Sequence, residues 1–267
     1  MSAAYEQLAL SALEQLGATT ALGQLDQIAQ QAAAEDWSYS HFLGRLFEPE
    51  LTARRQRVID TNLRFAGLPY LKRLEDFDFS FQPSIDKKLV EELATGRFLA
   101  DGRNVILLGP PGVGKTHLAI ALGVLSAELG HRLYFVSAME MARRLAAAFA
   151  QNRLGHAMKM LTQPRLLIID EVGYLGLDQA GAAMLFQVLC NRYEKSAATI
   201  ITSNKPFAEW AHIFAGDPVM ASAALDRLLH RATILNIKGE SYRLKDKRKA
   251  GLFASLQPKP EKPTKHQ

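Results

Sequence analysis

The segment Gly109–Thr116 constrains the fold more than any other part of this chain, and it reads Gly-Pro-Pro-Gly-Val-Gly-Lys-Thr. It lies between the apolar run Val105–Leu108 and the helical pattern Thr116–Leu129. Glycines in such a strand-to-helix turn let backbone N–H groups point inward, and the start of the helix adds its positive dipole end. The segment therefore predicts a phosphate-binding loop of the Walker A type within an α/β fold.

From residue 103 onward, short apolar runs alternate with helical patterns. Continuous apolar strands joined by helices are typical of a parallel sheet that is covered on both faces. We therefore expect a P-loop α/β domain with a five-stranded parallel sheet flanked by helices. The expected strands are Val105–Leu108, Leu133–Val136, Leu166–Ile169, Thr199–Ile201 and Thr233–Ile237. The helices between them are expected at Thr116–Leu129, Met139–Ala150 and Gln179–Tyr193.

The chain is expected to divide into three parts. Apolar positions at helical spacing predict a small all-helical domain at residues 1–68. Residues 69–250 hold the phosphate loop and the predicted sheet. Residues 251–267 are rich in Pro and Lys with almost no apolar side chains, which predicts a disordered basic tail.

Local signals add detail to the first two parts. Gly17, Gly44 and Pro49 are expected to separate short helices within the first domain. Phenylalanines alternate with polar residues at Phe77–Pro83, which predicts an extended link into the second domain. Ser84 is then expected to cap the short helix that follows.

Two side chains of the phosphate loop would carry its chemistry. Lys115 would neutralise charge on the β- and γ-phosphates of ATP, and Thr116 would ligate Mg²⁺. A Gly-rich turn that binds nothing is the alternative, but the strand before the loop and the helix after it argue against that interpretation. The residues expected to contact the nucleotide are Gly109, Pro110, Pro111, Gly112, Val113, Gly114, Lys115, Thr116, His117 and, further along the chain, Asp170.

An acidic pair follows the apolar run Leu166–Ile169, which gives this segment the Walker B form. Ligands of parallel sheets collect at the carboxyl ends of the strands, where Asp170 would hold Mg²⁺ through water. Glu171 is placed to polarise the attacking water as a general base. The alternative is a pair that caps the following turn. Together with the phosphate loop, the pair favours hydrolysis of ATP over its storage.

Three polar residues later in the chain are further catalytic candidates. Asn204 ends the next apolar run, where it would orient the water against the γ-phosphate; its alternative role is to form a turn before Pro206. Arg227 and Arg231 are four residues apart and would share one face of a helix. If that face meets the nucleotide of a neighbouring subunit, one of them becomes an arginine finger. Otherwise they are a solvated pair.

Positive charge gathers near both ends of the chain, which has a formal net charge of +5 and a pI of about 9.3. Residues 40–73 hold seven Lys or Arg and three acids, a net of +4, and residues 238–267 hold nine and three, a net of +6. Such regions suit an anionic polymer such as DNA, whereas solvated helix faces and a tail are the alternative. The residues expected to contact DNA phosphates are Arg45, Arg54, Arg55, Arg57, Arg64, Lys245, Lys247, Arg248 and Lys249.

Several other classes of protein are disfavoured. The sequence has no secretory signal pattern and no run of about 18 apolar residues, so we expect a cytoplasmic protein without a membrane partner. The single cysteine, Cys190, cannot form a disulfide within the chain and is expected to be a buried core thiol. The histidines show no metal-ligand spacing, so we expect no metal other than Mg²⁺.

These motifs, in this order, resemble those of AAA+ ATPases of the DnaC/IstB branch and, within that branch, the IstB-like transposition helper ATPases. The resemblance covers roughly residues 40–250. Besides the two Walker motifs and the run Ile-Thr-Ser-Asn at residues 201–204, it is carried by Leu74–Phe79, Gly109–Gly123, Phe207–Trp210, Leu225–Arg231 and Leu235–Leu244.

The resemblance implies an AAA+ core behind an N-terminal helical domain that binds DNA or a partner. It implies an ATP-dependent homo-oligomer that works on duplex DNA and recruits an IstA-like transposase. Asn204 matches the sensor I position, and the arginine-finger region contains both Arg227 and Arg231. Too little chain follows the fifth strand for the usual full C-terminal lid, so no sensor II arginine is assigned; Arg243 is the candidate for a substitute. A replicative helicase loader and a non-hydrolysing nucleotide switch remain the alternatives.

Overall fold

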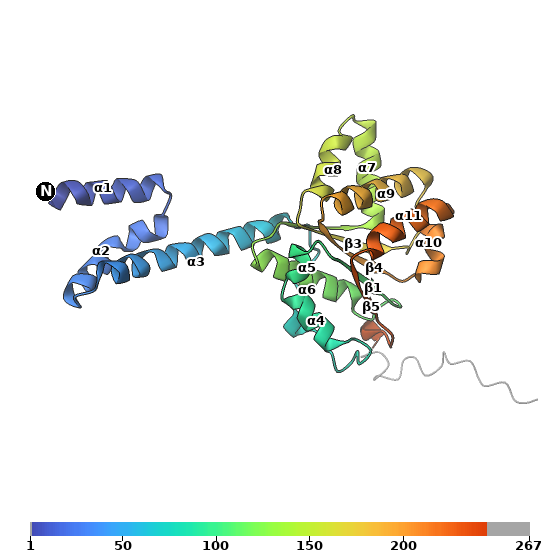
Figure 1. Cartoon of the computed structure of the whole chain (residues 1–267), viewed down its shortest axis with the longest axis horizontal. Coiled ribbons are helices and arrows are strands. Elements are labelled where there is room, and N and C mark those ends of the chain that lie inside the picture. Colours follow the sequence, from blue (N-terminus) through green and yellow to red (C-terminus); the bar gives the residue numbers. More distant parts are fainter. Residues whose placement is uncertain (1, 245–267) are drawn as a thin grey trace, which may run out of the picture. The chain divides into compact units, whose positions relative to one another are not determined.

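A computed structural model describes residues 2–244 of the chain (Figure 1). Its internal contacts divide the chain into two compact units, Met1–Arg64 and Phe65–Gln267. Within residues 2–244, no helix is both long enough and apolar enough to cross a membrane.

The N-terminal unit consists of helices, as the sequence predicts. They are α1 (Ser2–Gln15), α2 (Thr19–Ala34) and α3 (Tyr39–Phe65). Their small apolar core contains Leu13, Ala18, Ala21 and Leu46.

The predicted helix breaks at Gly44 and Pro49 are wrong, because α3 runs through both positions. A proline inside a helix removes one backbone hydrogen bond and costs about 3 kcal/mol. That cost is met by tertiary contacts on either side of the proline, since Leu46 and Glu50 of α3 are both buried against the rest of the unit. Packing therefore outweighs local propensity in this helix.

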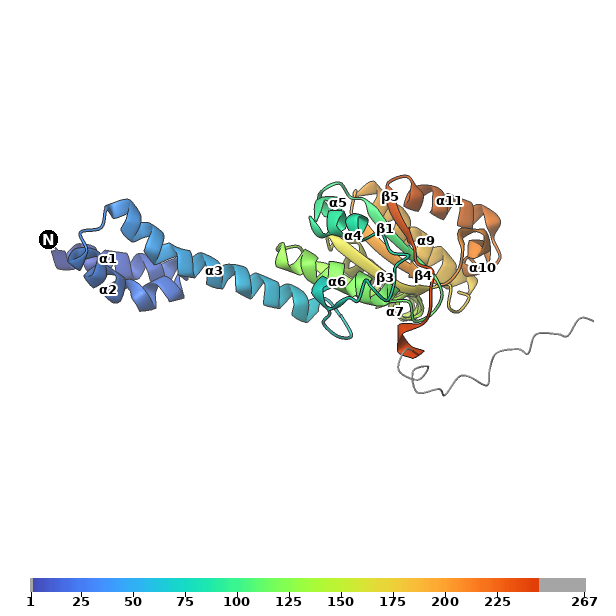
Figure 2. The same cartoon turned by 90° about the horizontal axis from the view of Figure 1, so that it is seen from below.

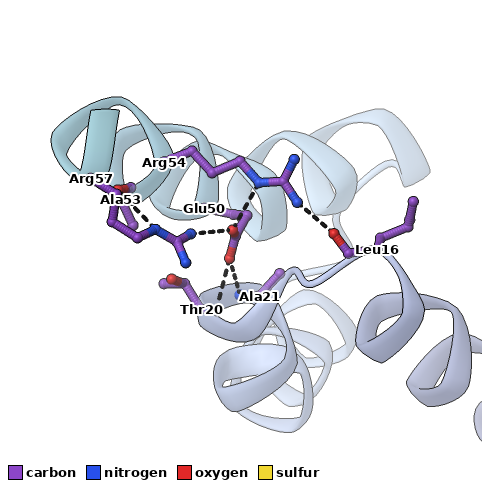
Figure 3. Close-up of polar contacts among 7 residues, drawn as sticks. All are labelled: Leu16, Thr20, Ala21, Glu50, Ala53, Arg54 and Arg57. Atoms are coloured by element: carbon purple, nitrogen blue, oxygen red, sulfur yellow. Dashed lines mark hydrogen bonds and ion pairs between the residues drawn. The ribbon is translucent and has the colours of Figure 1, made fainter. Parts of the chain in front are cut away.

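A buried carboxylate ties α3 to the start of α2, as Figure 3 shows. Glu50 is 3% exposed, and its Oε2 accepts hydrogen bonds from the backbone N–H groups of Thr20 at 2.8 Å and Ala21 at 3.4 Å. Its Oε1 accepts from Arg54 Nε at 3.2 Å and Arg57 Nη2 at 2.9 Å. Glu50 therefore caps the N-terminus of α2 from a different helix, where no side chain of α2 itself does so.

Acid is expected to loosen the N-terminal unit through Glu50. Burial of this carboxylate acts to raise its pKa, but hydrogen bonds from Thr20, Arg54 and Ala21 outweigh burial and lower the pKa from 4.5 to about 2. The stabilisation is therefore complete above pH 4.5 and is lost as the pH falls through about 2. Thermal unfolding of the full chain, followed by circular dichroism, should show Glu50→Gln less stable than the wild type at pH 6, with the difference shrinking towards pH 2. A difference that stays constant would contradict this role.

The second unit contains the predicted five-stranded parallel sheet, in the order β2-β3-β4-β1-β5. Every predicted apolar run overlaps an observed strand. The strands are β1 (Asn104–Leu108), β2 (Leu133–Ser137), β3 (Leu166–Val172), β4 (Ala198–Ser203) and β5 (Ala232–Asn236). The central strands are almost fully buried, which explains why they appear in the sequence as continuous apolar runs.

Helices cover both faces of this sheet (Figures 1 and 2). Their bounds are α4 (Lys87–Ala94), α5 (Arg97–Ala100), α6 (Lys115–Glu128), α7 (Ala138–Ala150), α8 (Leu154–Thr162), α9 (Gln179–Glu194), α10 (Trp210–Ile213) and α11 (Pro218–Leu229). Short 3-10 helices are η1 (Leu74–Asp76), η2 (Phe207–Glu209) and η3 (Tyr242–Leu244).

The alternation of side chains along β3 shows which helices lie on which face. Leu167 and Ile169 belong to the core cluster that also contains buried residues of α7, α9, α10 and α11. Ile168 points the other way, towards α6, where a Cβ added to Gly123 would lie 2.8 Å from its side chain. Because neighbouring residues of a strand face opposite sides, α6 covers one face and α7–α11 cover the other.

Three local predictions are wrong. The segment Phe77–Pro83 is not extended but folds into successive turns, with hydrogen bonds from Phe79 N to Phe77 O and from Gln82 N to Phe79 O. Asp86, rather than Ser84, caps α4 by accepting from the N–H groups of the first helical turn. The Ser84 hydroxyl bonds the backbone of Lys238 instead. Cys190 is only partly buried, because α9 turns Leu189 rather than its neighbour into the core.

Candidate active site

The predicted phosphate loop connects β1 to α6, as the sequence indicates. Gly112 and Gly114 have positive φ angles of 83° and 100°, which residues with a side chain rarely adopt. A Cβ at Gly112 would lie 2.1 Å from the hydroxyl oxygen of Ser241, and one at Gly114 would lie 2.6 Å from the Phe77 ring. The loop therefore needs glycine for its backbone conformation and for the close approach of other segments.

Lys115 and His117 lie in the first turn of α6. The Lys115 ammonium donates to the carbonyl oxygens of Gly109 and Pro110, each at 2.7 Å, which places a positive charge over the loop. His117 Nε2 lies 3.3 Å from the carbonyl oxygen of Arg73, and its ring meets Phe77 edge-on at 5.1 Å. Burial lowers the pKa of His117 below its usual 6.5, so this side chain is neutral at neutral pH.

A hydroxyl–carboxylate network links the phosphate loop to the sheet. Asp170 is 6% exposed, and its Oδ1 accepts hydrogen bonds from Thr116 Oγ1 at 3.0 Å and from Thr202 Oγ1 at 2.5 Å. Oxygen ligands of this kind suit a hard cation such as Mg²⁺. Among the residues that the structure describes, no group of three or more His, Cys, Asp or Glu could hold a metal ion. Any cation at Thr116 and Asp170 would therefore need phosphate or water oxygens as well.

Glu171 is presented to the site by an unusual backbone conformation. Its φ angle is +59°, in the left-handed region that costs energy for a residue with a side chain. The register of β3 against β4 shifts between Ile169 and Val172, which marks the same irregularity. The N–H of Glu171 donates to Thr202 Oγ1 at 3.0 Å. As a result, Asp170 faces inward to the network while the Glu171 side chain is exposed.

These segments surround one cavity of about 470 Å³. The predicted residues that line it are Pro111–His117, Glu171 and Asn204. Gly109, Pro110 and Asp170 do not line it. The carbonyl oxygens of Gly109 and Pro110 hold Lys115, and Asp170 accepts a hydrogen bond from Thr116. Asn204 Oδ1 is buried with no hydrogen-bond partner in the described part of the chain. This amide oxygen is therefore able to accept a hydrogen bond from a donor such as water.

Several residues of the cavity have no role assigned from the sequence, and Thr202 and Tyr242 are two of them. Thr202 bonds both Asp170 and Glu171. Its position at the end of an apolar run, two residues before Asn204, is a sequence feature that indicates a place near the site. Tyr242 also lines the cavity although it lies far along the chain, and no local pattern predicts this. Phe77 also lines the cavity, and the centre of its ring lies 4.9 Å from that of Phe79, which does not line it.

The prediction that Arg227 and Arg231 share one face of a helix is wrong. Helix α11 ends at Leu229, so Arg231 lies beyond it and does not share a helical face with Arg227. Arg227 donates to Ala223 O at 2.8 Å, and its guanidinium lies 5.5 Å from the centre of the Phe186 ring. Neither arginine lines the cavity. An arginine finger acts from a neighbouring subunit, so the role itself stays a prediction.

The predicted DNA-contacting residues fall into two groups. Lys245, Lys247, Arg248 and Lys249 lie outside the described residues, as does the side chain of Arg243. The other five lie on α3, where Arg54 and Arg57 bond Glu50. Arg55 and Arg64 are nine residues apart, about two and a half helical turns, so they point to opposite sides of α3. The arginines of α3, including Arg45, therefore surround the helix rather than forming one face.

Comparison with known proteins decides the family. The profile of the family described as "IstB-like ATP binding protein" matches residues 10–250. The chain belongs to the IstB-like ATP-binding proteins. This confirms the resemblance inferred from the Walker motifs and the segment Leu235–Leu244.

Individual relatives are similar over most of their length. The chain is 50% identical over 229 residues to an ATP-binding protein of insertion sequence IS21 from Pseudomonas aeruginosa, covering 86% of each protein. It is 46% identical over 221 residues to one of insertion sequence IS5376 from Geobacillus stearothermophilus, covering 83% of this chain and 87% of the relative.

Among solved structures, the fold is similar to that of AMPPCP-bound DnaA from Aquifex aeolicus. The TM-score is 0.53 with 20% identity over 72% of this chain and 58% of that one, a likeness of fold alone. The parallel sheet, the phosphate loop and the family together identify this IstB-like protein as a P-loop ATPase of the AAA+ type.

Proposed function

We propose that this IstB-like ATPase is a helper of DNA transposition that assembles as a homo-oligomer on duplex target DNA and recruits or stimulates a partner transposase. The observation that carries the proposal is the similarity, at 46% and 50% identity over more than four fifths of the chain, to ATP-binding proteins of insertion sequences. The ATP site and the basic residues of the N-terminal unit support it.

The cavity suggests how its residues would promote hydrolysis. When Mg²⁺ is bound, Thr116 and, through water, Asp170 would hold it, and it would neutralise phosphate charge. Lys115 would hold the β- and γ-phosphates, and Asn204 would orient the attacking water. Glu171 would accept a proton from that water as its oxygen bonds to the γ-phosphorus and the bond to the leaving ADP oxygen breaks.

Thr202 is expected to tune metal binding by holding Asp170. Thr202→Val removes the hydroxyl that donates to Asp170 at 2.5 Å and accepts from the Glu171 N–H, while keeping the size of the side chain. Loss of such an outer partner typically costs about 10–100-fold in metal affinity or activity. The Mg²⁺ concentration that gives half-maximal ATP turnover should rise accordingly, and Thr202→Ser should restore it. A normal Mg²⁺ dependence in Thr202→Val would contradict this role.

The proposed DNA contacts of α3 include three arginines outside the Glu50 cluster. Arg45, Arg55 and Arg64 would contact phosphates together with the basic run Lys245–Lys249, which gives binding that is largely independent of sequence and sensitive to salt. The N-terminal unit is thus proposed as a DNA- or partner-binding domain. Arg54 and Arg57 would contribute less, because Glu50 already neutralises part of their charge.

Binding of labelled DNA tests the proposed function. Duplex and single-stranded oligonucleotides of several lengths would be titrated with ATP, with ADP and without nucleotide, at two salt concentrations. We expect tight duplex binding that requires ATP, increases with length and weakens with salt. Arg55→Ala should lower the slope of log affinity against log salt concentration by about one. Lys87→Ala removes an exposed lysine that pairs with Glu91 and should leave this slope unchanged. A preference for single strands would instead favour a helicase loader.

A further inference from the structure

The segment that follows β5 crosses the phosphate loop. We call residues 238–244 the strap. Just before it, the N–H of Ile237 donates to Leu108 O at 2.7 Å, at the point where β1 enters the loop. Within it, the N–H of Tyr242 donates to Gly112 O at 2.9 Å, in the middle of the loop. The strap is therefore bonded directly to the backbone that would hold the phosphates.

A second set of bonds holds the strap from the other side. Ser84 Oγ accepts from the Lys238 N–H at 2.9 Å and donates to the Lys238 carbonyl oxygen at 2.5 Å. The buried side chain of Gln82 donates from Nε2 to Glu240 O at 2.8 Å. These partners are more than 150 residues away in sequence, so the strap joins the phosphate loop to the segment that forms another wall of the cavity.

The contact between strap and loop is close. Gly112 has no side chain, and a Cβ there would lie 2.1 Å from Ser241 Oγ. Gly239 has a φ of 141°, and a Cβ there would lie 2.7 Å from Gln82 Oε1. That oxygen is buried and lacks a hydrogen-bond partner among the described residues, which is a cost in the present position of the strap.

Tyr242 brings an aromatic ring to the cavity from this strap. Its side chain lines the cavity and is half exposed, and its ring packs edge-on against Phe81 at 5.1 Å. In the part of the chain that the structure describes, no helix follows β5 except the three-residue η3. We propose that the strap closes the nucleotide cavity and that Tyr242 contacts the bound nucleotide.

The chemistry of the residue fits this role. A tyrosine ring can stack on a nucleobase, and its hydroxyl can donate to a ribose or phosphate oxygen. Because the Tyr242 backbone is bonded to Gly112, any shift of the loop on nucleotide binding would be passed to the strap. This inference rests on ATP binding alone and not on the role in transposition.

Equilibrium binding of a fluorescent ATP analogue, without DNA, tests the contact. Tyr242→Ala should weaken binding by roughly three- to tenfold, the range expected for loss of one aromatic contact. Tyr242→Phe removes the hydroxyl but keeps the ring, so its affinity for the analogue shows how much of the contact the ring alone makes. Tyr193→Ala removes a similarly exposed tyrosine outside the cavity and should bind normally. Normal affinity in a folded Tyr242→Ala, in an assay where Lys115→Ala abolishes binding, would overturn the proposal while leaving the proposed function untouched.

Limited trypsin digestion of the full chain tests closure of the strap itself. Cleavage after Lys238 should slow when ATP is added to the wild type, because a closed strap is less accessible. Protection from trypsin by ATP should be lost in Lys115→Ala. It should be reduced in Tyr242→Ala when this variant and the wild type are compared at an ATP concentration that saturates both. Cleavage rates that do not respond to ATP in the wild type would show that the strap does not close.

Discussion

Glu171→Gln is expected to lower the maximal rate of ATP hydrolysis by about 10²–10⁴-fold, the usual contribution of a general base. An amide has nearly the shape of the carboxylate but cannot accept the proton that leaves the attacking water. The Glu171 backbone would stay in place, because its N–H still donates to Thr202 Oγ1. The hydroxyl–carboxylate network of Thr116, Asp170 and Thr202 does not use the replaced side chain.

The expected signature is a split between binding and turnover. Affinity for ATP should remain within a few-fold of the wild type, while single-turnover hydrolysis slows by orders of magnitude. Glu194→Gln, at the end of α9 and outside the cavity, is the matched control and should hydrolyse ATP normally. Turnover retained in Glu171→Gln would assign the base to another group. A wild type that does not hydrolyse ATP even with DNA would instead indicate a nucleotide switch.

The parts of the site that were predicted are those whose chemistry is contiguous in sequence. The phosphate loop keeps its glycines, Lys115 and Thr116 within eight residues, and the strand before Asp170 is apolar because both its faces are buried. Parallel strands then bring their carboxyl ends to one edge, so Asp170 and Asn204 meet at the loop. Local sequence pattern and sheet topology are therefore sufficient to predict the phosphate loop and the residues at the ends of β3 and β4.

The parts that were missed depend on contacts between distant segments. α3 continues through Pro49 because Glu50 caps a helix that begins 31 residues earlier in sequence, at Thr19. Ser84 does not cap α4 because its hydroxyl bonds Lys238. Both of these contacts join residues that lie far apart in the sequence, so rules based on neighbouring residues make a wrong prediction at Pro49 and at Ser84. The left-handed backbone of Glu171 belongs to the same class, since Thr202 of the next strand holds it.

A buried arginine offers the largest expected effect on stability. Arg192 of α9 is 1% exposed, and its guanidinium donates to Thr199 Oγ1 at 2.9 Å and to Leu161 O at 2.9 Å. It also donates to the carbonyl oxygens of Pro164, Arg165 and Ala198. Leu161 lies near the end of α8, Pro164 and Arg165 directly precede β3, and Ala198 and Thr199 begin β4. One side chain therefore joins a helix to two strands.

Burial of this guanidinium has an electrostatic cost, which lowers its pKa to about 9, with the charge of Arg165 adding to the effect. Arg192 is still protonated at neutral pH, so each of its donors remains available. Arg192→Met removes that cost but leaves several buried acceptors without a donor, at about 1–3 kcal/mol each. The net loss in the free energy of unfolding should be about 2–4 kcal/mol, less than the sum because the charge penalty is also removed.

Denaturant unfolding of the full chain measures this loss. Arg192→Lys keeps the charge but cannot reproduce the planar set of donors, so it should be intermediate. Arg103→Met is the control, because Arg103 is 41% exposed and pairs with the surface acids Asp101 and Glu92, contacts that are worth less than about 1 kcal/mol. The acceptors of Arg192 lie at the end of α8 and at the amino ends of β3 and β4, whereas Asp170 and Thr202 lie near the carboxyl ends of these strands. Folded Arg192→Met should therefore bind ATP normally, and lost affinity at temperatures where it is folded would show that the two ends of the sheet are coupled.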